Sequence, residues 1–229
     1  MSSNVLIHEL PSIGKCLLSS RSILKHQTVL QGTGNILNHP TTYTIQLSET
    51  QHCNVQAPLM YTSHSCQPNT RIVFTPNTIS SLSSTISPTI NTKQTNISSF
   101  SDTIYVNLIA IHDIEPKTLI SFDYCTSEWQ MASPFPCNCG APNCRGIIEG
   151  YKHLLYNQPE IALSLLPLCT AFIQSKTIQL LGNIYTNNNN NTYPSHTTST
   201  ADKSTIMYSS IQELLGKHSS STINNGNLH

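Results

Sequence analysis

The sequence predicts an α+β fold in which short β-strands precede a helical C-terminal part. Two observations support this prediction. Short runs of β-branched and other apolar residues, bounded by turn-forming residues, recur up to about residue 125. Apolar residues at helical spacing begin only after residue 150. A third observation, the absence of any internal repeat, argues against a solenoid.

Four segments have the composition of strands. Residues 42–47 alternate polar and apolar side chains, and residues 71–75 are similarly β-branched. Residues 104–111, with the sequence I-Y-V-N-L-I-A-I, give the strongest strand pattern in the chain. Residues 119–124 are expected to form a further strand. Residues 150–156 and 159–181 have helical spacing, and Pro167 interrupts the second of these segments.

The composition excludes several classes of protein. Charged residues make up only 10% of the chain, and 11 Lys and Arg balance 11 Asp and Glu. Without a basic excess, direct nucleic-acid binding is not expected. No long apolar run predicts a membrane span, and the N-terminus lacks the pattern of a secretory signal. We therefore expect an intracellular protein, located in either the nucleus or the cytoplasm.

Polar residues are concentrated in two segments. Residues 77–101 form a tract rich in Ser, Thr and Asn, and residues 183–229 form a similar tail that includes five consecutive Asn at 187–191. Both segments have too few apolar residues to offset the entropy lost on ordering, so disorder is predicted. Such tracts arise by compositional drift more often than for regulation, although both explanations stay open.

Three of the eight cysteines lie close together in the sequence P-C-N-C-G-A-P-N-C-R-G. Cys137, Cys139 and Cys144 are separated by turn-forming residues, including Gly140 and Gly146, that let a chain wrap around a metal. A structural zinc site normally takes four ligands, so a fourth must come from elsewhere in the chain.

A second dense motif is Y-T-S-H-S-C-Q-P-N. Taken alone, His64 and Cys66 could form a nucleophile pair, and a polar loop without chemistry is an equal alternative.

Together, three motifs resemble the SET-domain protein lysine methyltransferases with a post-SET zinc segment. These are S-H-S-C-x-P-N, then A-I-H-D-I-E-P-K-T-L-I-S-F-D-Y, and then the cysteine segment. The resemblance implies a β-rich fold of several small sheets with knot-like threading and C-terminal helices. It places the SET domain at residues 4–156, interrupted at 77–101, with the post-SET segment at 136–150. A helical segment at 157–182 follows.

The resemblance also implies roles for individual residues. Cys66 would join the three post-SET cysteines as the fourth zinc ligand, which argues against a free nucleophile. S-adenosylmethionine would be the cofactor, and Tyr124 the catalytic residue. Cofactor contacts would come from Gly14, Lys15, Cys16, Ser63, His64, Tyr124 and Phe135, with Trp129 as an alternative to Phe135.

The implied reaction transfers a methyl group to a lysine side chain of a protein, histone or non-histone. The tyrosine hydroxyl would orient the lysine amine without carrying charge. Tyr43 and Tyr61 are candidates for a second aromatic in the lysine channel, or for core positions. The sequence leaves the oligomeric state open.

Cys16, Ser63 and Thr118 depart from the family pattern. They motivate an alternative function, that of a catalytically degenerate SET module that binds a protein or peptide. A purely structural zinc ribbon is a third hypothesis, but it leaves the S-H-S-C-x-P-N and F-D-Y motifs unexplained.

Overall fold

The computed structural model describes residues 3–75 and 103–189. The predicted polar tract at 77–101 lies outside these ranges, and so does the part of the predicted tail at 183–229 that follows residue 189. Within them, none of the helices has the length and apolarity that crossing a bilayer would require.

The largest sheet is antiparallel and has the strand order β4-β5-β3-β8-β7. Its longest strand, β3, pairs with β5 along part of its length and with β8 on the other side. The inward side chains of β8 alternate along the strand, as the predicted pattern requires, and include the fully buried Val106 and Leu108. The strands are β3 (Thr28–Leu37), β4 (Thr44–Gln46), β5 (His52–Val55), β7 (Thr70–Thr75) and β8 (Thr103–Ala110).

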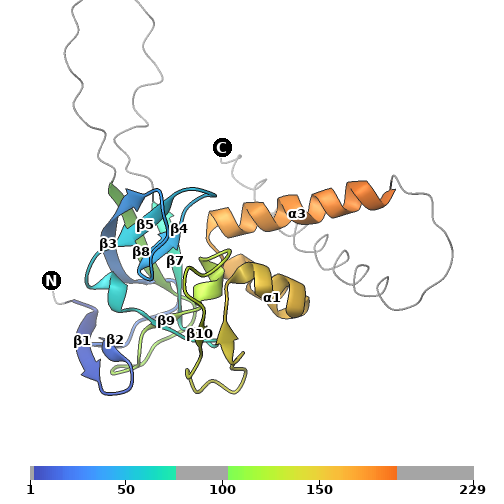
Figure 1. Cartoon of the computed structure of the whole chain (residues 1–229). Helices are drawn as coiled ribbons and strands as arrows, with labels where there is room; N and C mark the ends of the chain where they lie inside the picture. Colours follow the sequence, from blue (N-terminus) through green and yellow to red (C-terminus); the bar gives the residue numbers. More distant parts are fainter. Residues whose placement is uncertain (1–2, 76–102, 190–229) are drawn as a thin grey trace, which may run out of the picture.

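Three two-stranded sheets surround this sheet in the described residues. β1 and β2 form an antiparallel hairpin at the N-terminus, which lies below the main sheet in Figure 1. β6 and β9 are parallel, although about sixty residues separate them in the chain. The strands are β1 (Val5–Leu10), β2 (Gly14–Ser19), β6 (Ser63–His64), β9 (Ser121–Phe122), β10 (Phe135–Pro136) and β11 (Ile147–Ile148).

Helices follow the last sheet, namely α1 (Tyr151–Asn157), α2 (Pro159–Leu165) and α3 (Ala171–Asn189). Pro167 lies in a 3₁₀ turn at Leu166–Leu168, so the segment predicted as helical is divided where the proline lacks an N–H donor. The last helix passes the predicted boundary at residue 182, because a single internal glycine weakens a helix without ending it. In Figure 1, α3 extends away from the main sheet.

The α+β class and the several small sheets are confirmed, as are strands within 42–47, 71–75 and 104–111. The strand predicted at 119–124 is wrong over most of its length. Only Ser121–Phe122 pairs as a strand, and Tyr124–Thr126 turns into a 3₁₀ helix. The turn begins because the Asp123 side chain accepts a hydrogen bond from the Cys125 N–H, which caps it.

Residues 117–122 are threaded between two earlier parts of the chain. On one side, the Ile120 N–H donates to the Leu17 carbonyl of β2 at 2.8 Å. On the other side, the Ser63 N–H donates to the Ile120 carbonyl at 3.3 Å. The side-chain amide of Asn69 extends this ladder, donating to the Leu119 carbonyl and accepting from the Ser121 N–H. An asparagine thus replaces backbone pairing where the strand is irregular.

The buried side chains form two apolar clusters. One fills the space between the main sheet and the β1–β2 hairpin. The other surrounds Cys66, Cys137 and the helices. Tyr124 packs against both clusters, so the end of the threaded segment lies at their junction.

Replacing Asn69 with alanine should lower the free energy of unfolding by about 1–3 kcal/mol, because a partly buried carbonyl and a buried N–H lose their partner. Urea denaturation of the purified chain measures the change. Asn157→Ala, an equal truncation at an exposed position at the end of α1, is the control and should change stability far less. Equal effects of the two substitutions would contradict the role assigned to Asn69.

Candidate functional site

Four thiols meet between the threaded segment and the β10–β11 region. The sulfur atoms of Cys66, Cys137, Cys139 and Cys144 all lie within 4.8 Å of one another. The Sγ atoms of Cys66 and Cys137 are 3.9 Å apart. Cys66 and Cys137 are buried and Cys144 is exposed, so the cluster lies at the edge of the second apolar cluster.

This arrangement fits a tetrahedral metal. With Zn–S bonds of about 2.3 Å, neighbouring sulfurs of a tetrahedral zinc site lie about 3.8 Å apart. Gly140 and Gly146 have positive φ values of 71° and 78°, and a Cβ atom added at either residue would meet no other part of the chain within 4 Å. Glycine is therefore required at these positions for its left-handed backbone conformation, which lets the cysteine segment turn tightly, as the sequence predicted. The four thiols could hold a zinc ion.

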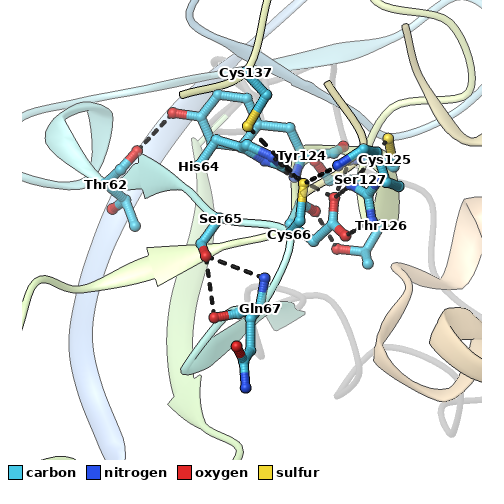
Figure 2. A network of polar contacts seen from close by, with 12 residues as sticks. Thr62, His64, Ser65, Cys66, Gln67, Tyr124, Cys125, Thr126, Ser127 and Cys137 are labelled. Carbon is cyan, nitrogen blue, oxygen red and sulfur yellow. Dashed lines mark hydrogen bonds and ion pairs between the residues drawn. The ribbon is translucent and has the colours of Figure 1, made fainter. Parts of the chain in front are cut away.

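His64 connects the thiols to Tyr124. Burial, partly offset by the Asp123 carboxylate, lowers the pKa of His64 to about 4, so its ring is neutral near pH 7. Its Nδ1 accepts a hydrogen bond from the Tyr124 N–H at 3.2 Å. The proton therefore resides on Nε2, which lies 3.4 Å from the Cys66 sulfur and donates to it. Figure 2 shows Tyr124, His64 and Cys66 in this sequence of contacts.

A buried ion pair fixes the same region from the other side. Both guanidinium NH groups of Arg145 donate to the Asp123 carboxylate at 2.6 Å. The two side chains are only 5% and 0% exposed. The Arg145 backbone N–H also donates to the Cys66 sulfur at 3.4 Å. One residue of the cysteine segment therefore contacts both the cap of the 3₁₀ turn and a thiol.

A groove of about 1040 Å³ passes along this site. Five predicted cofactor contacts line it together, although they come from distant parts of the chain. These are Lys15, Ser63, His64, Tyr124 and Phe135. Its walls also include Tyr61 from the first part of the chain and residues 136–139 from the cysteine segment.

A second, more apolar cavity of about 300 Å³ shares part of this wall. Tyr43, Met60, Thr62, Tyr124 and Phe135 line both spaces. The Tyr124 hydroxyl donates to the Thr62 carbonyl at 2.7 Å, a contact drawn in Figure 2. Burial raises the pKa of Tyr124 to about 12, so its hydroxyl is neutral at physiological pH. Tyr124, with a neutral hydroxyl, therefore lines both the groove and the cavity.

Three predicted residues lie elsewhere. Gly14 has a positive φ of 71° at the start of β2 and does not line the groove. Cys16 is fully buried in the β1–β2 sheet, with its backbone paired to His8. Trp129 also does not line the groove, because its ring packs near Tyr151 and beneath the Lys176 ammonium group. Of the two aromatic candidates, only Phe135 reaches the groove.

The sequence reasoning missed several site residues. Asp123 and Arg145 lie within the quoted motifs, as the Asp of F-D-Y and the Arg of C-R-G, so their positions beside Tyr124 and Cys144 could have suggested a role. Thr62 contributes a backbone carbonyl, which no side-chain pattern reveals. Glu128 lines the apolar cavity and follows Tyr124 by one helical turn.

Comparison with known proteins gives matches at the level of structure. No family model matches the chain, and neither does any curated protein. The structure of KRYPTONITE in complex with mCHG DNA and SAH is 18% identical, with a TM-score of 0.44 over 64% of this chain. A second KRYPTONITE structure, with mCHH DNA, an H3(1-15) peptide and SAH, matches with the same identity and TM-score.

A Plasmodium falciparum protein described as a histone methyltransferase is 12% identical, with a TM-score of 0.41 over 57% of this chain. The match covers all of the Plasmodium chain but only 29% and 30% of the two KRYPTONITE chains.

Replacing Asp123 with asparagine should destabilise the chain by about 3–5 kcal/mol, because the Arg145 guanidinium would stay buried without its counter-charge. Urea denaturation measures the loss. Asp113→Asn is the matched control, since Asp113 is exposed and also accepts a backbone hydrogen bond, from the Lys25 N–H. A loss no larger than that of the control would show that the ion pair does not hold the site together.

Proposed function

We propose that this chain is an S-adenosylmethionine-dependent methyltransferase whose acceptor is a lysine side chain of a protein, as the SET-domain resemblance implies. The observation that carries the proposal is the position of Tyr124. This residue, whose hydroxyl is neutral, lines both a large groove and a smaller, more apolar cavity. A methyl donor in one space and an amine in the other would meet at this residue.

The groove is the proposed site of the cofactor. Lys15 lies over the Tyr61 ring at 5.6 Å and lines the groove, so its positive charge could pair with the carboxylate of the cofactor. His64 and Phe135 supply aromatic edges, with their ring centroids 5.8 Å apart. When bound, S-adenosylmethionine supplies the methyl group from a positively charged sulfonium.

The chain's own contribution is to position and desolvate the acceptor. Phe122 and Tyr124 pack with ring centroids 4.7 Å apart, and Phe135 approaches Tyr124 from the cysteine segment. These aromatic walls exclude water from the amine, and desolvation favours the neutral form that attacks. The Tyr124 hydroxyl, fixed by the Thr62 carbonyl, keeps one lone pair available to orient N–H groups.

The four thiols are the proposed zinc ligands. A zinc ion there would join Cys66, beside His64, to the segment that carries Phe135 across the groove. The metal would therefore act structurally, by holding one wall of the cofactor site in place. The His64 Nε2–H bond to Cys66 would support the thiolate in the way that outer hydrogen bonds support metal ligands.

Two departures from the family pattern are compatible with this proposal. The Cys16 side chain is buried in the hairpin and does not enter the groove. Thr118 lines the groove, and its backbone N–H is held by the Ser19 hydroxyl at 2.9 Å. Neither substitution places a bulky side chain where the cofactor is proposed to bind.

Tyr124→Phe should lower methyl transfer by at least about hundredfold, because the hydroxyl that orients the amine is removed while the ring packing stays. The measurement is release of S-adenosylhomocysteine with an array of lysine-containing peptides that includes histone H3 residues 1–15. Tyr156→Phe, at an exposed position of α1, is the control and should keep full activity.

Calorimetry with S-adenosylmethionine separates the alternatives. Binding without turnover in the unmodified chain would favour a module that only binds peptides. No binding to zinc-loaded protein would overturn the proposed function.

The purified chain should hold one zinc per molecule, and Cys139→Ser should weaken zinc binding by at least about hundredfold. A competition assay with a chromogenic chelator measures the affinity, and the melting temperature should fall when metal is removed. Cys53→Ser, which changes a buried thiol of β5 outside the cluster, should keep the metal. Zinc binding that is unaffected by Cys139→Ser would contradict the assigned ligand set.

A further inference from the structure

Among the described residues that line the apolar cavity, Glu128 is the one acidic group, and none of the others could pair with its charge as a cation. Glu128 is 7% exposed and lies among Tyr43, Tyr124, Met131 and other apolar or neutral residues that line the cavity. No Lys, Arg or His is among these lining residues. Because an unpaired charge in such a place is costly, the carboxyl group must be neutral when the cavity is empty or pair with a cation that enters it.

The structural contacts of Glu128 do not require a carboxylate. Oε1 accepts a hydrogen bond from the Gln46 N–H of β4 at 2.9 Å, and the Gln46 side chain accepts from the Trp129 N–H in return. The Glu128 carbonyl accepts from the Tyr151 N–H of α1. A glutamine at this position could make the same contacts, so the negative charge serves another purpose.

Within the part of the chain that the structure describes, the groups that contact Glu128 from neighbouring elements are uncharged. They are Gln46 of β4, Tyr124 of the 3₁₀ turn and Tyr151 of α1. The Lys176 ammonium, which lies over the Trp129 ring, is paired with the Glu49 carboxylate. Burial raises the pKa of Glu128 to about 8, and the hydrogen bond from Gln46 offsets only part of this rise.

We propose that Glu128 binds the cationic head group of the acceptor side chain and so selects an ammonium group for the cavity beside Tyr124. This inference rests on the proposed lysine methylation and adds the group that recognises the acceptor. Within the resulting pair, one proton moves from nitrogen to the carboxylate. An N–H bond breaks and an O–H bond forms, which leaves a neutral amine and a neutral acid in the apolar cavity.

Binding of a simple cation tests the proposal without any methyl transfer. The probe is n-butylammonium, which reproduces the lysine side chain, and 1-pentanol is the uncharged probe of similar size. NMR titrations of the full chain between pH 7 and pH 9 should show n-butylammonium affinity rising about tenfold, as a carboxyl group with a pKa of about 8 ionises. The affinity for 1-pentanol should stay constant.

Glu128→Gln should remove both the preference for the cation and its dependence on pH, while 1-pentanol binding reports that the cavity is intact. Glu160→Gln, the same change at an exposed position of α2, should behave like the unmodified chain. If Glu128→Gln does not fold, the pH dependence of the unmodified chain still decides the matter. Equal affinities for the two probes at pH 9, or equal cation affinity in the Glu128→Gln variant, would overturn the inference.

Methylation by the same proteins separates this inference from the proposed function. Glu128→Gln should lower the methylation rate at least about tenfold at pH 8. If cation binding depends on Glu128 but the chain does not methylate any peptide, the proposed function is wrong and the cation site is still supported. Full methylation by Glu128→Gln would remove the inference alone.

Discussion

The arrangement of the site depends on the buried ion pair between Asp123 and Arg145. Asp123 caps the 3₁₀ turn that presents Tyr124, and Arg145 belongs to the segment that carries three of the four clustered cysteines. Two charges removed from water stabilise a fold only if both partners stay in place. The main effect of the pair is therefore to fix the position of the cysteine segment, and its net contribution to the stability of the fold is small. Tyr124 and Cys66 keep their relative positions because both ends of this connection are fixed.

The local pattern of the sequence predicted strands where burial alternates along the chain, as in β8. It did not predict β3, the longest strand. Gly32 and Gly34 interrupt its apolar pattern, since glycine has low strand propensity. The structure explains both glycines: a Cβ atom at Gly32 would lie 2.6 Å from Leu59, and one at Gly34 would lie 2.8 Å from the Asn54 carbonyl oxygen. Close packing therefore requires glycine at these two positions, and without side chains there the strand lacks the apolar alternation by which a strand is recognised in a sequence. The threaded segment was mistaken for a longer strand because its strand-like composition continues past Phe122, where the Asp123 cap begins a 3₁₀ turn.

The site was more predictable than the sheets, because its chemistry is concentrated in short motifs. Turn residues around the cysteines indicated a metal-binding loop, and the fourth thiol, at Cys66, was inferred only through the family resemblance. The four sulfur atoms do lie together. The spacing of residues along the sequence could not predict which residues of different motifs contact one another. Glu128 is an example, since an isolated acid in a polar stretch is usually exposed, and only the fold shows it inside an apolar cavity.

The threading of residues 117–122 limits how early the fold can be completed while the chain is being synthesised. The carbonyl of Leu17 has its partner at Ile120, roughly a hundred residues downstream, and the N–H of Ser63 has its partner at the same residue, roughly sixty residues downstream. Neither the hairpin nor the S-H-S-C loop can complete its hydrogen bonds until residue 120 has left the ribosome. The cysteine segment follows within about twenty-five residues. In a nascent chain, both halves of the groove therefore stay incomplete until nearly all of the cysteines of the cluster have been synthesised. The groove forms late and as one unit.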